Sequence, residues 1–174
     1  MKQEFINKLI ELEFVKFGLF QLKSGKQSNI YFDIRNIISF PDVILQLTSL
    51  LKERILPVDR ICGVPYGALC LSTSLSLETK IPQILKRKEI KSYGSKKIID
   101  GNFNQGDKVL LIEDVITSGL SLMETINELE NNGLIIEKIL IVLDRQEGGI
   151  DLLKEKGYNV ESILTKEELL LNLN

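Results

Sequence analysis

The sequence predicts an α/β domain in which helices cover both faces of a central parallel β-sheet. From about residue 60 onward, short apolar segments alternate with segments of helical spacing, the order typical of parallel strands joined by helical crossovers. The apolar segments are continuous, which indicates strands buried on both faces. The chain has 174 residues, enough for one domain around a single core.

The first part of the chain precedes this alternation. Apolar side chains at helical spacing predict an amphipathic helix over residues 2–14. Aromatic and branched residues then predict short strands over 17–22 and 30–34, separated by a polar turn. Residues 41–55 form the next predicted helix, which begins with a proline, a residue favoured at the first helical position.

The remaining elements follow in alternation. Strands are predicted over residues 60–64, 83–86, 108–112, 139–143 and 160–164. Helices are predicted over residues 68–78, 120–131, 151–156 and 166–173. Gly133 and Gly157 lie where two of these helices should end, because glycine adopts the left-handed conformation of a helix C-terminus. Ligands bind beyond the carboxyl ends of parallel strands, so the segments that follow the strands are the candidate sites.

Composition excludes several function classes. There is no histidine, which excludes Ser-His-Asp and Cys-His relays, imidazole metal ligands and histidine pH switches. The formal net charge of −2 argues against a nucleic-acid partner. Cys62 and Cys70 lie in apolar stretches and favour free thiols in a reducing compartment. No signal peptide and no apolar run of about 20 residues is present, so we expect a cytoplasmic protein with no membrane partner.

The most informative segment follows the strand at 108–112. Two acids, Glu113 and Asp114, precede a loop with the sequence Val115-Ile116-Thr117-Ser118-Gly119-Leu120-Ser121. Backbone amides at a helix start, a glycine and hydroxyl groups suit a phosphate monoester. Carboxylates accept hydrogen bonds from sugar hydroxyls, so a phosphorylated ribose fits both halves. The structural alternative, a helix capped by Thr117 or Ser118, leaves the two acids unexplained.

The segments after two further strands have features that suit phosphate binding. The segment Cys62-Gly63-Val64-Pro65-Tyr66-Gly67-Ala68 could turn its backbone toward a diphosphate, or be an ordinary Pro-Gly turn. Residues 86–97 hold six basic residues and one acid, hence a net charge of +5. Such a loop could close over a polyphosphate, and a solvated charge run is the alternative. Neither a Walker loop nor a dinucleotide fingerprint is present.

A fourth strand end carries Arg145, in the segment Asp144-Arg145-Gln146-Glu147-Gly148-Gly149. A guanidinium offers a planar fork to a carboxylate or a carbonyl edge. The alternative is an acid–base pair that caps a turn.

Taken in order, these segments resemble the orotate phosphoribosyltransferases, a family of the type I phosphoribosyltransferases, from about Phe17 to Thr165. The resemblance also includes the stretch Phe20-Gln21-Leu22-Lys23-Ser24-Gly25 and is nearer to the animal bifunctional type than to the short bacterial type. It implies the type I phosphoribosyltransferase fold in one domain over residues 1–174. About 1–40 would contribute to a small N-terminal hood, and about 58–165 would form the core.

The resemblance implies transfer of the phosphoribosyl group of phosphoribosyl diphosphate (PRPP) to orotate in UMP biosynthesis, with Mg²⁺ held mainly by PRPP and water. Lys91 and Asp114 are the implied catalytic residues. The implied PRPP contacts are Lys23, Tyr66, Arg87, Lys88, Lys91, Tyr93, Glu113, Asp114, Val115, Ile116, Thr117, Ser118, Gly119, Leu120 and Ser121. The implied orotate contacts are Lys23, Tyr31, Phe32, Thr117 and Arg145. For Tyr31 and Phe32, strand packing is the alternative.

The resemblance further implies a homodimer in which the basic loop, residues 86–97, acts in the neighbouring subunit. A further implication of the resemblance is association with orotidine 5′-phosphate decarboxylase. Gly67 and Tyr93 depart from the pattern of many bacterial members, which have lysine and histidine there. The family's loop at Tyr66 often contains a cis peptide. Rival functions are a purine-type phosphoribosyltransferase, a non-enzymatic regulator that binds PRPP or RNA, and a generic sugar-phosphate binder.

Overall fold

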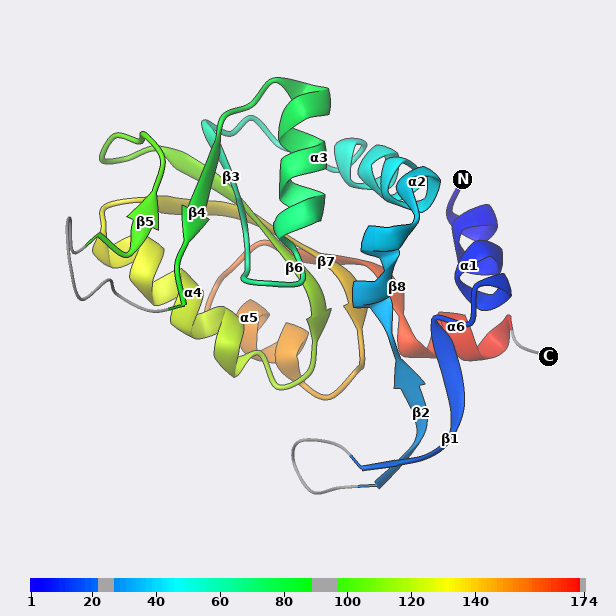
Figure 1. Ribbon diagram of the computed structural model, residues 1–174. Helices are drawn as coiled ribbons and strands as arrows, with labels where there is room; N and C mark the ends of the chain where they lie inside the picture. Colours follow the sequence, from blue (N-terminus) through cyan, green and yellow to red (C-terminus); the bar gives the residue numbers. More distant parts are fainter. Residues whose placement is uncertain (22–26, 89–96, 173–174) are drawn as a thin grey trace.

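The computed structural model describes residues 1–21, 27–88 and 97–172, and a six-stranded sheet forms its centre (Figure 1). The strand order is β5-β4-β3-β6-β7-β8. The bounds are β3 (Arg60–Gly63), β4 (Gln83–Lys86), β5 (Ile99–Asp100), β6 (Lys108–Ile116), β7 (Ile135–Asp144) and β8 (Val160–Thr165). Neighbouring strands pair in parallel except β4 and β5, which pair antiparallel. The predicted fold class is confirmed, and β5 is an edge strand that was not predicted.

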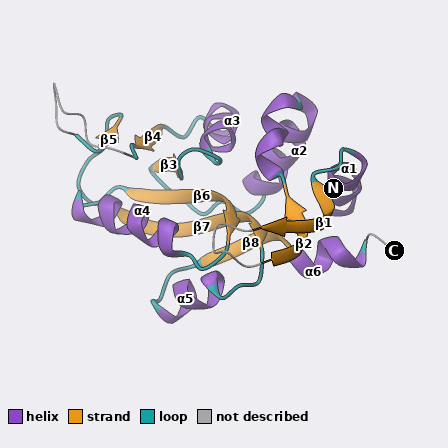
Figure 2. Ribbon diagram, turned by 60° about the horizontal axis from the view of Figure 1, so that its bottom comes forward, coloured by secondary structure: helices purple, strands orange, loops and turns teal. Residues whose placement is uncertain are grey.

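Helices cover both faces of this sheet (Figure 2). One face carries α2 (Pro41–Lys52) and α3 (Leu69–Thr79), and the other carries α4 (Leu120–Asn131) and α5 (Gly149–Glu155). The hydrophobic cluster on the α2 side also includes residues of α1 (Lys2–Glu11) and α6 (Lys166–Leu171). Side chains of β6 alternate between the two clusters, so this strand is buried on both faces as its continuous apolar sequence predicts.

An antiparallel hairpin of β1 (Val15–Gln21) and β2 (Gln27–Phe32) forms a second, separate sheet. In Figure 1 it lies on the side of the molecule where β6 and β7 end. A 3₁₀ helix, η1 (Ile34–Ser39), connects β2 to α2 and was not predicted. Within the described residues, no helix has the length and hydropathy that a membrane span needs.

Several predicted boundaries were off by three or four residues, including the start of β2, the end of α2 and the start of β7, and two of the differences have identifiable reasons. The first helix ends at Glu11 rather than residue 14, because Glu13 adopts a left-handed conformation with φ 55°. The strand predicted over 108–112 continues to Ile116, because its parallel pairing with β7 continues through the acid pair. Glu113 and Asp114 therefore belong to a strand rather than to the loop after it.

Three charged side chains, Lys138, Arg54 and Glu161, form a cluster at strands β7 and β8. Lys138 is buried, with 9% of its surface exposed, and its Nζ lies 2.8 Å from Oε2 of Glu161. The Nε of Arg54 lies 3.0 Å from Oε1 of the same carboxylate. Partial burial alone would raise the pKa of Glu161, but Lys138 and Arg54 outweigh it and lower the pKa. Glu161 is therefore the counter-charge of a buried lysine.

Replacing Glu161 with glutamine should destabilise the protein, because the Lys138 ammonium would stay buried without a counter-charge. The side chain of Glu161 is 42% exposed, so we expect a loss of about 1–2 kcal/mol in urea unfolding at pH 7. Glu78→Gln, which removes the exposed pair with Lys52, is the matched control and should have a much smaller effect. Equal effects of the two substitutions would contradict this role.

Candidate active site

The carboxyl end of β6 places the acid pair against the loop that follows β3. Glu113 is buried, with 5% of its surface exposed, and its Oε1 accepts a 3.1 Å hydrogen bond from the Asp114 amide. The carboxylate of Asp114 lies over Gly67, where a Cβ atom at position 67 would overlap its oxygens. The glycine that departs from the bacterial pattern thus leaves room for an acid of the site.

The loop after β3 contacts both the basic segment and this acid pair. The peptide bond between Pro65 and Tyr66 is cis, as the family resemblance implies. The ring of Tyr66 is 69% exposed, and Nζ of Lys88 lies 4.6 Å from the ring centroid. The second and third predicted segments are therefore neighbours in the fold.

The predicted phosphate loop is short and begins after Ile116. Gly119, at φ 79°, is the N-cap residue of α4, and no side chain caps this helix. Capping by Thr117 or Ser118 is therefore not what the loop does. The amides of the first turn of α4 have no partner within the helix, as at any helix N-terminus, and suit an anion.

Arg145 lies between this loop and the N-terminal hairpin. Its amide donates to the carbonyl of Ile116 at 3.1 Å, which ties it to the end of β6. Its Cζ lies 5.9 Å from the ring centroid of Phe32, and its Nη2 lies 3.0 Å from Oε1 of Glu147. Its Nε is buried and has no hydrogen-bond partner among the described residues. An arginine with a buried, unused donor is suited to binding an acceptor on a ligand.

Gly119 and Gly149 lie where the phosphate loop approaches the Arg145 loop most closely. A Cβ atom at Gly149 would overlap the carbonyl oxygen of Thr117 and lie 2.6 Å from Cγ1 of Ile116. One at Gly119 would lie 3.3 Å from Cα of Gly149. A side chain at position 149 would separate the two loops, and one at position 119 would make a tight contact with Gly149.

Other predicted residues are placed less directly. Lys23, Lys91 and Tyr93 lie outside the described residues. Val115 and Ile116 pack into the two core clusters, so any contact to PRPP would come from their backbone. Leu120 and Ser121 lie exposed in the first turn of α4. Tyr31 packs against Phe20, with ring centroids 5.4 Å apart.

Phe32 is buried beneath Arg145, with 8% of its surface exposed. The strand-packing alternative therefore describes it well, and it also supports the guanidinium. Sequence reasoning missed Asp100, which pairs with Arg87, because only the pairing of β5 with β4 brings the two together. It also missed Glu147 and Gly149 as contacts of the site.

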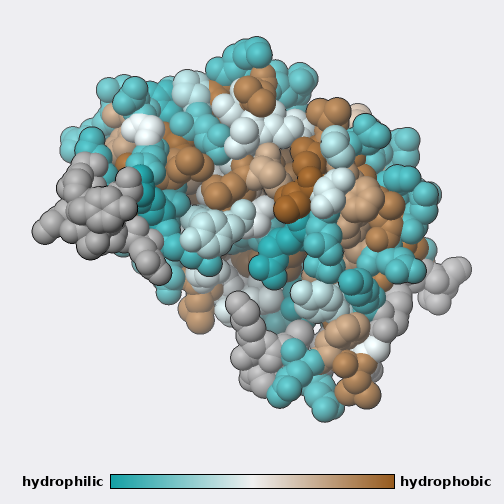
Figure 3. Space-filling view, in the orientation of Figure 1, coloured by the Kyte–Doolittle hydropathy of each residue, from teal (hydrophilic) through white to brown (hydrophobic). Residues whose placement is uncertain are grey.

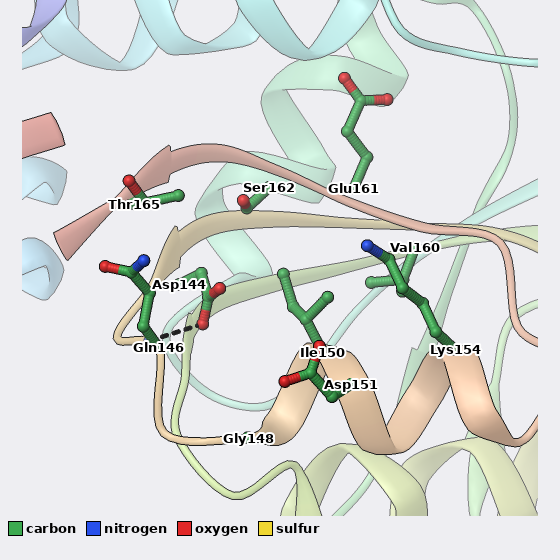
Figure 4. A pocket seen from close by; sticks show the side chains of 10 residues that line it. All are labelled: Asp144, Gln146, Gly148, Ile150, Asp151, Lys154, Val160, Glu161, Ser162 and Thr165. Atoms are coloured by element: carbon green, nitrogen blue, oxygen red, sulfur yellow. Dashed lines mark hydrogen bonds between the residues drawn. The ribbon is translucent and has the colours of Figure 1, made fainter. Parts of the chain in front are cut away.

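A separate hollow of about 460 Å³ lies between α5 and the edge strand β8 (Figure 4). Its lining consists of Asp144, Gln146, Gly148, Ile150, Asp151, Lys154, Val160, Glu161, Ser162 and Thr165. Oδ1 of Asp144 accepts a 2.8 Å hydrogen bond from the amide of Gln146, drawn as a dashed line in Figure 4. These two residues flank Arg145, so this bond shapes its turn. None of the predicted substrate contacts lines the hollow.

The acid pair has unusual electrostatics. Burial first, and then the side-chain hydrogen bond and charge of Asp114, raise the pKa of Glu113 from 4.5 to about 9, and the hydrogen bond from the Asp114 amide offsets only part of this rise. Desolvation and a neighbouring like charge both disfavour the ionised form of a carboxyl group. This environment therefore favours the protonated form of Glu113, which can donate as well as accept a hydrogen bond.

A parallel sheet that carries an acid pair, a phosphate loop and a cationic segment at its carboxyl ends is the arrangement of a type I phosphoribosyltransferase. No protein-family model matches the chain. It is 41% identical to an orotate phosphoribosyltransferase of Caenorhabditis elegans over 171 residues, covering 96% of this chain and 75% of that protein. It is 39% identical to that of Pyrococcus horikoshii over 173 residues, covering 97% and 93%.

Among solved structures, UMP synthase of Leishmania donovani superposes with a TM-score of 0.87 at 33% identity, covering 96% of this chain and 37% of that one. The chain belongs to the orotate phosphoribosyltransferase family. Because the chain matches orotate phosphoribosyltransferases, that function describes it better than the purine-type or non-enzymatic alternatives do.

The raised pKa of Glu113 predicts a pH-dependent effect on stability. A group whose pKa is raised on folding contributes stability that is complete below the unfolded pKa and is lost as pH rises through the folded one. Between about pH 5 and pH 9, the melting temperature of the wild type should therefore fall more than that of Glu113→Gln. Thermal unfolding of both proteins across this range measures the difference. Parallel curves would contradict the raised pKa.

The contact between the two loops predicts a specific effect of Gly149→Ala. The added methyl group must displace the carbonyl of Thr117, so we expect binding of ribose 5-phosphate to weaken by about tenfold or more in calorimetry. Gly148→Ala is the matched control. A Cβ atom there meets open space, although φ is 92°, so it should cost stability but not affinity. Equal affinities for the two variants would contradict the contact.

Proposed function

We propose that this protein transfers the phosphoribosyl group of PRPP to orotate, giving orotidine 5′-monophosphate and pyrophosphate. One observation carries the proposal: a continuous line of contacts runs through all four predicted segments. It passes from Phe32 to Arg145, from the Arg145 loop to the phosphate loop, from Asp114 to Gly67, and from Tyr66 to Lys88. A substrate with a carboxylate, a ribose phosphate and a diphosphate would meet a suitable group at each point.

The roles follow from the chemistry of each group. The phosphate loop, residues 117–121, binds the 5′-phosphate through backbone amides and hydroxyls. Glu113 and Asp114 hold the ribose hydroxyls, and Glu113 can donate a hydrogen bond when it is protonated. The guanidinium of Arg145 binds the carboxylate or a carbonyl edge of orotate. These contacts orient the anomeric carbon toward the attacking ring nitrogen.

In the reaction, the bond from the anomeric carbon to the diphosphate oxygen breaks with its electron pair on pyrophosphate. A bond from the orotate ring nitrogen to the same carbon forms, and the proton of that N–H leaves to pyrophosphate or water. Because negative charge grows on the leaving group, cations near the diphosphate stabilise the transition state. We assign this role to Arg87, Lys88 and Lys91, and the family resemblance implies Lys23 and Tyr93 as further PRPP contacts.

Mg²⁺ would be held mainly by PRPP oxygens and water, and it would neutralise charge on the diphosphate. The hard carboxylate oxygens of Asp114, half-buried beside the diphosphate loop, fit such an ion as a direct or water-bridged contact.

We also propose a homodimer in which the basic loop, residues 86–97, serves the neighbouring subunit. Leu85 on β4, directly before the loop, is 38% exposed, and Leu77 on α3 is 66% exposed. Hydrophobic surface appears among hydrophilic surface in this region of the molecule (Figure 3). Association with a separate orotidine 5′-phosphate decarboxylase and a cytoplasmic location remain predictions. Both cysteines, Cys62 and Cys70, are free thiols.

The proposed reaction predicts that the protein consumes orotate when PRPP and Mg²⁺ are present. Loss of orotate absorbance measures turnover, and hypoxanthine, adenine and uracil serve as competing bases. We expect orotate alone to be converted at an appreciable rate. No loss of orotate at high enzyme concentration would overturn the proposal.

Lys91→Ala should leave the fold intact and lower kcat by about 10²–10³-fold, since it removes a cation from the developing pyrophosphate charge. Circular dichroism and thermal unfolding check the fold, and the orotate assay gives kcat. Lys154→Ala, on exposed α5 surface, is the control and should match the wild type. An unchanged kcat for Lys91→Ala would remove the basic loop from the mechanism.

A further inference from the structure

The edge strand β5 brings an acid to the first arginine of the basic segment. β5 pairs antiparallel with β4 in the register Leu85↔Asp100 and Lys86↔Ile99. The amide of Arg87 donates to the carbonyl of Ile98 at 2.8 Å and extends this pairing by one bond. The two ends of the segment between residues 87 and 98 are thus held together where they leave the sheet (Figure 1).

The side chains form a short ion pair at the same place. Nη2 of Arg87 lies 2.6 Å from Oδ1 and 2.5 Å from Oδ2 of Asp100. The Arg87 side chain is 27% exposed, while its Nε is buried and has no hydrogen-bond partner among the described residues. One nitrogen of the guanidinium is therefore engaged by the protein, and a buried donor remains unused.

The position of Asp100 is itself restricted. Gly101 follows it with φ +101°, a conformation that side chains rarely adopt, and a Cβ there would lie 3.2 Å from the carbonyl oxygen of Gln83. The chain therefore turns away directly after Asp100, whose backbone pairs opposite Leu85 of β4 and whose 43% exposed side chain contacts Arg87. A restrained carboxylate that holds one end of a guanidinium reduces the rotamer freedom which an arginine loses on binding a ligand.

We propose that Asp100 is a positioning residue for the reaction, which holds Arg87 in the orientation that binds the diphosphate of PRPP. The inference rests on the proposed function. Asp100 does not touch substrate, and its effect acts through the guanidinium of Arg87. Lys88, the next residue, already contacts the diphosphate loop at Tyr66, so an oriented Arg87 lies at the edge of the same site.

The test compares Asp100→Ala, Asp100→Asn and Asp100→Glu in the orotate assay. We expect Asp100→Ala to raise KM for PRPP about tenfold and to leave KM for orotate within twofold of the wild type. Asp100→Asn keeps an acceptor without the charge and should be intermediate. Asp100→Glu restores the charge and should recover at least half of the lost kcat/KM for PRPP.

Asp107→Ala is the matched control, because Asp107 forms the same kind of pair with Arg60 at 2.8 Å, at the amino ends of β3 and β6. It should lower the melting temperature and leave both KM values unchanged. An unchanged or lowered KM for PRPP in Asp100→Ala, or failure of Asp100→Glu to recover activity, would overturn the inference. Absence of turnover in the wild type would instead overturn the proposed function.

Discussion

The parallel pairing of β3 with β6 is the constraint on which the site depends. These strands are neighbours in the sheet but far apart in sequence, and the chain turns in opposite directions along the sheet after each of them. Loops at such a switch point diverge and leave a crevice. The diphosphate loop after β3 and the acid pair of β6 meet there, with Asp114 over Gly67. The remaining loops are arranged around this meeting point.

Glycines decide how closely the loops approach. Gly67 makes room for a carboxylate, and Gly119 and Gly149 let the phosphate loop touch the Arg145 loop. Around them, charged groups are held by partners within the chain: Arg145 by Glu147, Arg87 by Asp100, and Lys88 by the ring of Tyr66. These three described cations are therefore already oriented by the chain itself, and this reduces the entropy lost on binding.

Much of this could be predicted from the sequence, because strands buried on both faces have continuous apolar runs and glycines mark helix ends. Gly133 and Gly157 are left-handed at φ 81° and 87°, as predicted. The strand end at Ile116 could not be predicted, because Glu113 and Asp114 interrupt the apolar pattern while the pairing with β7 continues. β5 is only two residues long and depends on β4, so neither it nor the Asp100 pair has a local signal.

The most direct test is a crystal structure of the protein with orotidine 5′-monophosphate bound. We expect the phosphate on the amides of residues 117–121, the ribose hydroxyls on Glu113 and Asp114, and the base carboxylate on Arg145. A nucleotide with its phosphate or carboxylate elsewhere, for example in the hollow between α5 and β8, would contradict the assignment of the site to the carboxyl ends of β3 and β6.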